Sequence, residues 1–213
     1  MKPRILLADD HALVLEGFKK LLEEYCEVVG AVEDGRALLE AAERLHPDVI
    51  ALDISMPHLN GVDAARQLRK LVPQAKLIFI TMHADQAYVS QAFKAGASGY
   101  LLKRSVGSEL VQAIHAVTQG NYYVTSLVAK DMVHAAIGGT HPPIVRSNQL
   151  SARQREILQL VAEGLAVKEI AATLRISPKT VEYHKSKLME QLDLHTTAEL
   201  TKYALTHGLI PAE

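Results

Sequence analysis

Five polar side chains in the first half of the sequence each follow a short run of apolar residues. Asp9 and Asp10 follow the first run, Asp53 the third, Thr81 the fourth and Lys103 the fifth. The carboxyl ends of parallel strands meet at one rim of a sheet, so these side chains would converge there. Three carboxylates packed together repel one another unless a cation neutralises them, and their hard oxygen ligands suit Mg²⁺.

We call these five residues the acidic rim, and their chemistry suits phosphoryl transfer. A carboxylate that attacks a phosphoryl group needs shielding, because both reactants are anionic. Lys103 can neutralise the phosphate that forms, and Thr81 can donate a hydrogen bond to it. The simpler alternative for a single acid is a helix cap, which Asp10 could provide for a helix that starts near His11. Independent caps would not gather at one rim, so the set favours a site.

The elements that would position the acidic rim alternate regularly along the first 120 residues. Runs this short and apolar are typical of strands buried on both faces, and the segments between them have helical periodicity. Alternation repeated five times predicts an α/β fold, with a five-stranded parallel sheet doubly wound by helices. The predicted strands are Ile5–Ala8, Val28–Val32, Val49–Leu52, Leu77–Ile80 and Tyr100–Leu102, and the predicted helices lie near 11–24, 35–46, 61–71, 85–95 and 106–118.

The pattern changes after Gly120. A further helix is expected over 124–137, and the run from Gly138 to Pro143 then predicts a linker. From Ser151 onward the sequence has helical periods only. We expect a domain over 1–121, a linker with a helix over 122–148, and a small all-α domain over 149–213. The helices expected in that last domain lie near 152–163, 167–174, 178–192 and 196–207.

The residue pattern over 170–181 is typical of a helix-turn-helix. One helix ends near Leu174, Ser177 is an expected N-cap, and Pro178 takes the first helical position, which proline tolerates. The second helix has apolar residues that can pack and polar and basic residues that can face outward. Such a helix fits the major groove of DNA. The alternative is a plain amphipathic bundle with a solvated basic face.

Composition limits the remaining possibilities. The 23 basic and 24 acidic residues nearly balance, so any surface for nucleic acid must be a local patch. The single cysteine, Cys26, cannot form an intramolecular disulfide and fits a reducing compartment. The sequence has no apolar stretch long enough to span a membrane and no signal peptide, so we expect a cytoplasmic protein without membrane contact. The ten histidines have no paired ligand spacing, which argues against structural zinc.

Residues 1–120 resemble the receiver domain of two-component response regulators, which has a flavodoxin-like fold. The resemblance implies that Asp53 is the phosphoacceptor and that Asp9, Asp10, Asp53 and the Ser55 carbonyl hold Mg²⁺. It also implies that Thr81 and Tyr100 form a switch pair, in which the hydroxyl moves to the phosphate and the ring turns inward. The matching pieces are Leu6–His11, Leu52–Pro57, Asn60–Gly61, Thr81 and Gly99–Lys103.

Residues 150–210 resemble the LuxR-type DNA-binding domain, so the whole chain resembles the NarL/FixJ type of regulator. The resemblance makes 178–192 the recognition helix and the helix near 196–207 a dimer contact. The matching pieces are Leu150–Leu158, Ala162–Gly164, Lys168–Ala171, Leu174–Val181 and His184. The implied base-facing residues are Glu182, Tyr183 and Ser186, and those near phosphates are Lys168, Lys179, Thr180, Lys185 and Lys187.

Several positions bear on how closely the families' properties apply, among them Ala166 and Val167, which replace the small polar pair that usually precedes Lys168. Met82 is larger than the residue that many receivers carry after the switch threonine, and it narrows the expected access for a phosphodonor. His83 occupies a position that influences phosphoryl lifetime in the family, although an exposed loop histidine is the simpler interpretation. Glu182 is acidic where relatives often carry lysine; it could accept a hydrogen bond from cytosine or be repelled by the backbone.

The sequence therefore predicts a transcriptional response regulator and not a turnover enzyme. Phosphorylation of Asp53 by a sensor histidine kinase would favour a homodimer that binds promoter DNA, either through an altered receiver face or by release of a docked DNA-binding domain. RNA polymerase is a further candidate partner. One alternative is a receiver that is not phosphorylated and regulates by constitutive dimerisation. A weaker one is an Asp-nucleophile phosphohydrolase, which needs a second acid often found where Ser55 stands.

Overall fold

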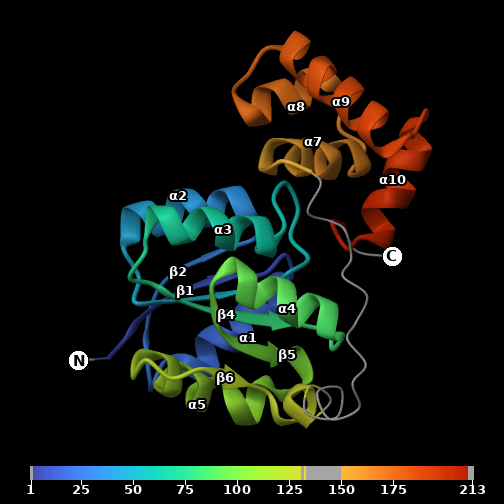
Figure 1. Ribbon diagram of the computed structural model, residues 1–213. Coiled ribbons are helices and arrows are strands. Elements are labelled where there is room, and N and C mark those ends of the chain that lie inside the picture. The colour runs from blue at the N-terminus through green and yellow to red at the C-terminus, as the bar shows by residue number, and fades with distance from the viewer. Residues whose placement is uncertain (1, 131, 133–149, 211–213) are drawn as a thin grey trace.

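The computed structural model describes residues 2–130, 132 and 150–210. The chain forms an α/β domain followed by a small helical domain, which lies beyond helices α2 and α3 in Figure 1. The sheet has the order β2-β1-β3-β4-β5-β6, and every pairing is parallel. Its strands are β1 Arg4–Ala8, β2 Glu27–Val32, β3 Val49–Leu52, β4 Lys76–Thr81, β5 Ala97–Leu102 and β6 Tyr123–Val124.

Helices cover both faces of this sheet (Figure 1). One apolar core joins the sheet to α2, α3 and α4, and a second joins it to α1 and α5. Strands covered on both sides must be apolar at nearly every position, which is why β3 reads Val-Ile-Ala-Leu and is buried throughout. The five helices are α1 Ala12–Leu22, α2 Gly35–Leu45, α3 Gly61–Leu71, α4 Gln86–Ala95 and α5 Val106–Thr118.

The predicted α/β fold is confirmed, with one correction to the strand count. The sheet has a sixth strand, β6, which lies inside the segment predicted as a linker and pairs with β5 at Gly99 and Tyr100. A strand of two residues is too short to show a periodic pattern. The helix expected over 124–137 falls partly outside the described residues; within them, residues 126–130 and 132 are helical. The Gly138–Pro143 stretch also lies outside them.

Local chemistry fixes the start of α3 close to the third strand. The Asn60 side chain accepts a hydrogen bond from the Asp63 backbone N–H, which makes it the N-cap. A Cβ at Gly61 would lie 1.9 Å from the backbone oxygen of Asp53, so only glycine fits there. The backbone N–H of Gly61 also donates to the Ile54 carbonyl. These contacts hold the β3–α3 loop, residues 54–60, against the end of β3.

The helical domain has the predicted four helices, and their observed bounds lie within two residues of those expected. Ser151, Ser177 and Thr196 each cap a helix by accepting a backbone N–H, and Pro178 is the first residue of its helix. A separate apolar core, with Ile157, Ile170 and Leu188 fully buried, holds the helices together. They are α7 Ala152–Ala162, α8 Val167–Leu174, α9 Pro178–Leu192 and α10 Thr197–Thr206.

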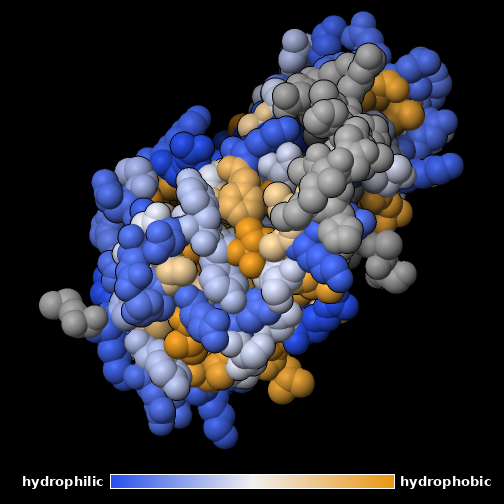
Figure 2. All heavy atoms as spheres, turned by 60° about the horizontal axis from the view of Figure 1, so that its bottom comes forward, coloured by the Kyte–Doolittle hydropathy of each residue, from blue (hydrophilic) through white to orange (hydrophobic). Residues whose placement is uncertain are grey.

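The surface is mixed in character. Figure 2, which brings the bottom of Figure 1 forward, shows small separate hydrophobic areas among hydrophilic side chains. Large exposed apolar side chains lie far apart in the sequence, as Leu13, Met82 and Tyr122 do. Within the described residues, no helix combines the length and apolar character that crossing a membrane requires.

Candidate functional site: an acidic rim and a helix-turn-helix

The structure brings the predicted acidic rim together. Asp9 and Asp53 follow β1 and β3 and are buried, and Thr81 ends β4 with no exposed surface. Lys103, directly after β5, places its Nζ 2.7 Å from Asp9 Oδ2 and 2.7 Å from Asp53 Oδ2. One ammonium group therefore bridges the carboxylates of two strands that neighbour each other in the sheet.

Burial and charge pairing have opposite effects on the pKa values of Asp53 and Lys103. Burial raises the pKa of Asp53, and the hydrogen bond and charge of Lys103 oppose that rise without cancelling it. Burial also disfavours the charged form of Lys103, but the contacts with Asp53 and Asp9 outweigh it and raise the pKa of the ammonium. The rim thus holds more negative charge than one lysine neutralises, and a divalent cation would relieve the excess.

The ligand atoms at the end of β1 fit such a cation. Oxygen or nitrogen atoms of Asp9, Asp10 and His11 all lie within 4.8 Å of one another. The Nδ1 of His11 lies 2.7 Å from Asp10 Oδ1 and 3.2 Å from Asp9 Oδ1. The alternative that Asp10 caps the following helix is wrong: His11 occupies the N-cap position, without a side-chain cap. The sequence did not single out His11 as a neighbour of the rim.

The two residues of the predicted switch pair lie on adjacent strands, and both are fully buried. Tyr100 already points inward: its ring packs against Phe79, and its hydroxyl donates to the His83 carbonyl at 2.8 Å. The Thr81 hydroxyl accepts a hydrogen bond from the His83 backbone N–H. The inward ring is the arrangement that the family resemblance associates with phosphorylation.

His83 is not the exposed loop histidine that the simpler interpretation expected. Its side chain is half-buried, stacks on Tyr88 with the ring centroids 4.1 Å apart, and has Nε2 at 3.3 Å from Ser55 Oγ. His83 thus joins the β3–α3 loop to the start of α4. Sequence alone placed it two residues beyond Thr81 but could not supply its partners.

The predicted DNA-contacting side chains lie at the start of α8 and along α9. Val181 and Leu188 of α9 are buried in the domain core, so the remaining faces of the helix turn outward. Tyr183 is 60% exposed. Lys187 also pairs with Glu190 at 2.8 Å, an exposed contact that DNA phosphates could replace. The exposed residues of the predicted set are Lys168, Lys179, Glu182, Tyr183, Ser186 and Lys187, and the half-buried ones are Thr180 and Lys185.

Sequence analysis missed a group of polar residues on α7 that contact the α/β domain. Gln159 is 1% exposed although it lies on a helix of a separate domain. Glu156, also buried, contacts Arg36 of α2 and Gln67 of α3. The only signal in the sequence is that Gln159 interrupts the apolar run from Ile157 to Val161, and this does not identify a partner.

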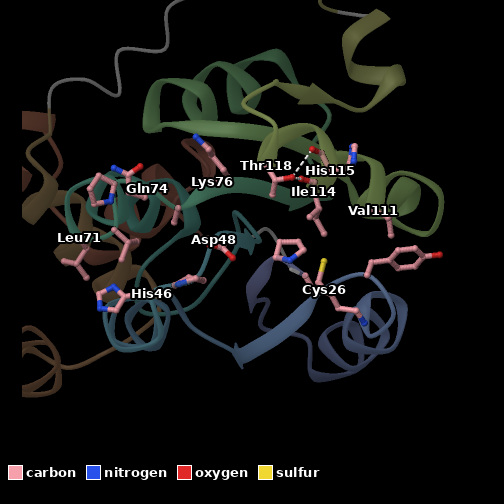
Figure 3. Close-up of a pocket in the computed structure, with 17 residues that line it drawn as sticks. Cys26, His46, Asp48, Leu71, Gln74, Lys76, Val111, Ile114, His115 and Thr118 are labelled. Atoms are coloured by element: carbon pink, nitrogen blue, oxygen red, sulfur yellow. Dashed lines mark hydrogen bonds between the residues drawn. The ribbon is translucent and has the colours of Figure 1, made fainter.

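A pocket of about 810 Å³ lies at the opposite edge of the sheet, near the amino ends of the strands. Figure 3 shows Cys26, Asp48 and Ile114 around it. The Asp48 carboxylate accepts a hydrogen bond from the Arg4 backbone N–H, so it is already used by the fold. The pocket contains no residue of the acidic rim.

Comparison with known proteins assigns both halves of the chain. Residues 5–115 match the response regulator receiver domain, and residues 148–204 match the bacterial regulatory proteins of the luxR family. Transcriptional regulatory protein MctR of Rhizobium johnstonii is 38% identical, with 98% of this chain and 96% of the relative covered. Oxygen regulatory protein NreC of Staphylococcus haemolyticus is 36% identical, with 97% and 99% covered.

Solved structures agree with that assignment. The RcsB response regulator of Salmonella typhimurium has a TM-score of 0.64 at 28% identity, with 97% of this chain and 98% of that chain covered. A structure of an RcsB–DNA complex has a TM-score of 0.60 at 29% identity, with 95% and 98% covered. The similarity therefore extends over both domains.

Proposed function

Because the chain belongs to the two-component response regulators that join a receiver domain to a LuxR-type DNA-binding domain, we propose that phosphorylation of Asp53 controls its binding to promoter DNA. The observation that carries this proposal is the position of Lys103 between the carboxylates of Asp9 and Asp53. A charged lysine there can stay with Asp53 when the carboxylate becomes an acyl phosphate. Thr81 is the hydroxyl on the next strand that can reach the phosphoryl oxygens.

Magnesium is the cofactor that the donor set supports. Asp9 and Asp10, whose ligand atoms lie within 4.8 Å of each other, would hold it. The family resemblance adds Asp53 and the backbone carbonyl of Ser55. The ion supplies charge neutralisation for a reaction between two anions. The residues of this chain do the rest: Asp53 provides the nucleophilic oxygen, Lys103 compensates the added charge, and Thr81 and Tyr100 carry the change to the β4–α4 loop. The acyl phosphate is labile, so the signal decays without a turnover reaction.

The partners follow from the two domains. A sensor histidine kinase would supply the phosphoryl group, and promoter DNA would bind the exposed side of α9. A homodimer using α10 would place two such helices on two half-sites. The DNA target supports a cytoplasmic location, and contact with RNA polymerase stays a prediction. We assign the receiver to 1–121, the connecting segment to 122–148 and the DNA-binding domain to 149–213.

Intact mass spectrometry tests the phosphoacceptor. The protein is incubated with Mg²⁺ and a small-molecule phosphodonor, with Asp53→Asn as the control. We expect the mass of one phosphoryl group on the wild type, none on the variant, and none on the wild type when Mg²⁺ is removed by a chelator. A mass gain of equal size on Asp53→Asn would refute the assignment of Asp53.

The two alternatives give different results in the same experiment. A receiver that is not phosphorylated would gain no mass and would bind DNA equally with and without the phosphodonor. A phosphohydrolase would release phosphate from a generic ester over many turnovers. The presence of Ser55, where such an enzyme would often carry a second acid, argues against turnover.

A further inference from the structure

The DNA-binding domain contacts the receiver along one stripe of helix α7, in addition to the contacts of Glu156 with Arg36 and Gln67. Arg155, Gln159 and Glu163 are spaced four residues apart, so they lie along one side of the helix and its C-cap. All three contact the β3–α3 loop or the first turn of α3. We call these three residues the docking stripe. The loop that they contact begins directly after Asp53, the proposed phosphoacceptor.

Gln159 forms the centre of the contact. Its Nε2 donates to the Met56 carbonyl at 2.9 Å, and its Oε1 accepts from the Asn60 backbone N–H at 2.8 Å and from Asn60 Nδ2 at 3.1 Å. One buried amide therefore forms hydrogen bonds with two positions of the β3–α3 loop, Met56 and Asn60. A buried amide is costly to leave unpaired, so a shift of the loop weakens the contact and a loss of the contact frees the loop.

Charged pairs flank this amide. The Arg155 Nε donates to both carboxylate oxygens of Asp63, at 2.8 and 3.1 Å, and Asp63 is 4% exposed. The Glu163 carboxylate accepts from the His58 backbone N–H at 3.1 and 3.2 Å. These contacts are specific in geometry, because one uses a defined backbone N–H and the other a guanidinium Nε–H that is shared between both oxygens of one carboxylate. The interface is therefore a built recognition surface for this loop.

Two observations bear on what the docked arrangement does. First, it leaves the predicted DNA face of α9 free, with Lys179, Glu182 and Tyr183 exposed while α7 is docked. Figure 1 shows α7 on the receiver side of its domain, with α8 and α9 beyond it. Second, Tyr100 is already inward, in the arrangement that the switch mechanism assigns to the phosphorylated receiver. Docking thus coexists with an accessible DNA face and an inward Tyr100 ring.

We propose that the docked arrangement is the DNA-binding form of this protein, and that the Gln159 amide couples the phosphorylation site to it. This inference rests on the proposed function and decides between its two mechanisms, since it excludes activation by release of the DNA-binding domain. A phosphoryl group on Asp53 fixes the β3–α3 loop, and the fixed loop holds α7. Coupling between two binding sites is reciprocal, so the docked domain must in turn favour ligands at the acidic rim.

The test uses the full-length protein with Gln159→Leu, which removes the amide at similar volume. The matched control is Gln154→Leu, a change of the same kind on the same helix. Its amide pairs with Gln191 and with the Ser151 backbone N–H, both inside the DNA-binding domain. Mg²⁺ with beryllofluoride serves as a non-covalent phosphoryl mimic, so that its affinity is an equilibrium quantity. The DNA is a duplex that the wild type selects from a random-sequence pool.

We expect beryllofluoride to tighten DNA binding by the wild type and by Gln154→Leu. In Gln159→Leu this gain should fall by at least about fivefold, and DNA should in turn tighten beryllofluoride binding less by the same factor. The unloaded variant should bind DNA no more tightly than the unloaded wild type. Glu163→Ala removes the acceptor for the His58 backbone N–H and for the Gln159 amide. It should also lower the gain, so that the result does not depend on a folding defect of one variant.

Three results would overturn the inference. Unloaded Gln159→Leu could bind DNA as tightly as the loaded wild type, which would make docking inhibitory. Gln159→Leu could keep the full gain, or Gln154→Leu could lose it equally, and the docking stripe would then have no coupling role of its own. A wild type that gains no affinity at all contradicts the proposed function itself, which separates that failure from the other three.

Discussion

At the scale of single residues, the acidic rim is held together by Lys103, whose ammonium group pairs with both Asp9 and Asp53. Lys103 directly follows β5, and the two carboxylates directly follow β1 and β3. The order of the sheet places β1 next to β3, so their carboxylates must face each other. Without a cation between them, the two groups would repel at short range in a poorly solvated site. Lys103 therefore has a structural role even before any phosphate is present.

We predict that Lys103→Met lowers the free energy of unfolding by about 1–3 kcal/mol in the absence of divalent cations, because it leaves two buried carboxylates without their partner. Mg²⁺ should restore a large part of that loss, and it should stabilise the variant more than the wild type. Urea denaturation with and without Mg²⁺ measures both effects. Equal stabilisation of the two proteins by Mg²⁺ would contradict the proposed ligand set.

Cys26 gives a prediction that depends on pH. The thiol is 4% exposed, and burial raises its pKa, although nearby Lys2 opposes the rise. A raised pKa in the folded state means that the protonated thiol is favoured, and that its contribution to stability is lost as the pH rises through the folded pKa. Alkylation of the native protein should therefore be slower than that of the denatured protein, with its midpoint at higher pH. Identical rates in both states would show that the thiol is accessible.

At the scale of elements, the junction between β3 and α3 is the most constrained part of the fold. Asp53, the β3–α3 loop and the start of α3 are held together by close backbone contacts. Glycine at position 61 is required because the Asp53 carbonyl occupies the place of a Cβ, and no positive φ is involved. The same close packing that positions Asp53 also holds the loop that Gln159 contacts.

Gly61→Ala should therefore destabilise the protein by about 1–3 kcal/mol or more, because the added methyl group must displace the end of β3. Gly107→Ala is a matched control, since Gly107 also lies in the first turn of a helix and a Cβ there meets nothing within 4 Å. That change should stabilise the protein by about 0.4–1 kcal/mol through the unfolded state. Thermal unfolding of both variants checks the opposite signs, and a loss of equal size in both would contradict the packing argument.

Helix α9 yields a test of the predicted DNA face. Lys179→Ala should weaken binding to all DNA sequences and lower the slope of log affinity against log salt by about one, because one phosphate contact is lost. Lys202→Ala is the control, since Lys202 is an exposed lysine of the same domain on α10. Affinity is measured at several salt concentrations. An unchanged slope for Lys179→Ala would remove this residue from the DNA contact.

These elements also show what the sequence could and could not predict. The helix bounds were predictable because caps such as Ser177 and the proline after it have local causes. The acidic rim was predictable because parallel strands end at one edge, whatever the details of packing. Strand β6 and the contacts of His83 were not, since two residues have no period and a side-chain partner is a property of the folded chain. The burial of Gln159 was hidden for the same reason, because it depends on a second domain.

At the scale of the whole molecule, the two domains have separate apolar cores, and polar groups connect them. Contacts of this kind are geometrically specific, but they contribute less stability than a shared core would. Because this interface between the domains contributes little free energy, a change in the position of the residues that it contacts can alter it. The β3–α3 loop contains such residues, because it follows Asp53 and contacts the docking stripe. The proposed coupling therefore runs from Asp53 to helix α7 through one short loop.

The central claim is that phosphorylation of Asp53 changes DNA binding. The most direct measurement is the affinity of the full-length protein for a selected DNA duplex, before and after treatment with Mg²⁺ and a small-molecule phosphodonor, with Asp53→Asn alongside. We predict that the treated wild type binds at least about fivefold more tightly, as expected for coupled sites, and that the variant does not change. Equal affinity of the treated and untreated wild type, once mass spectrometry has confirmed phosphorylation, would contradict the claim.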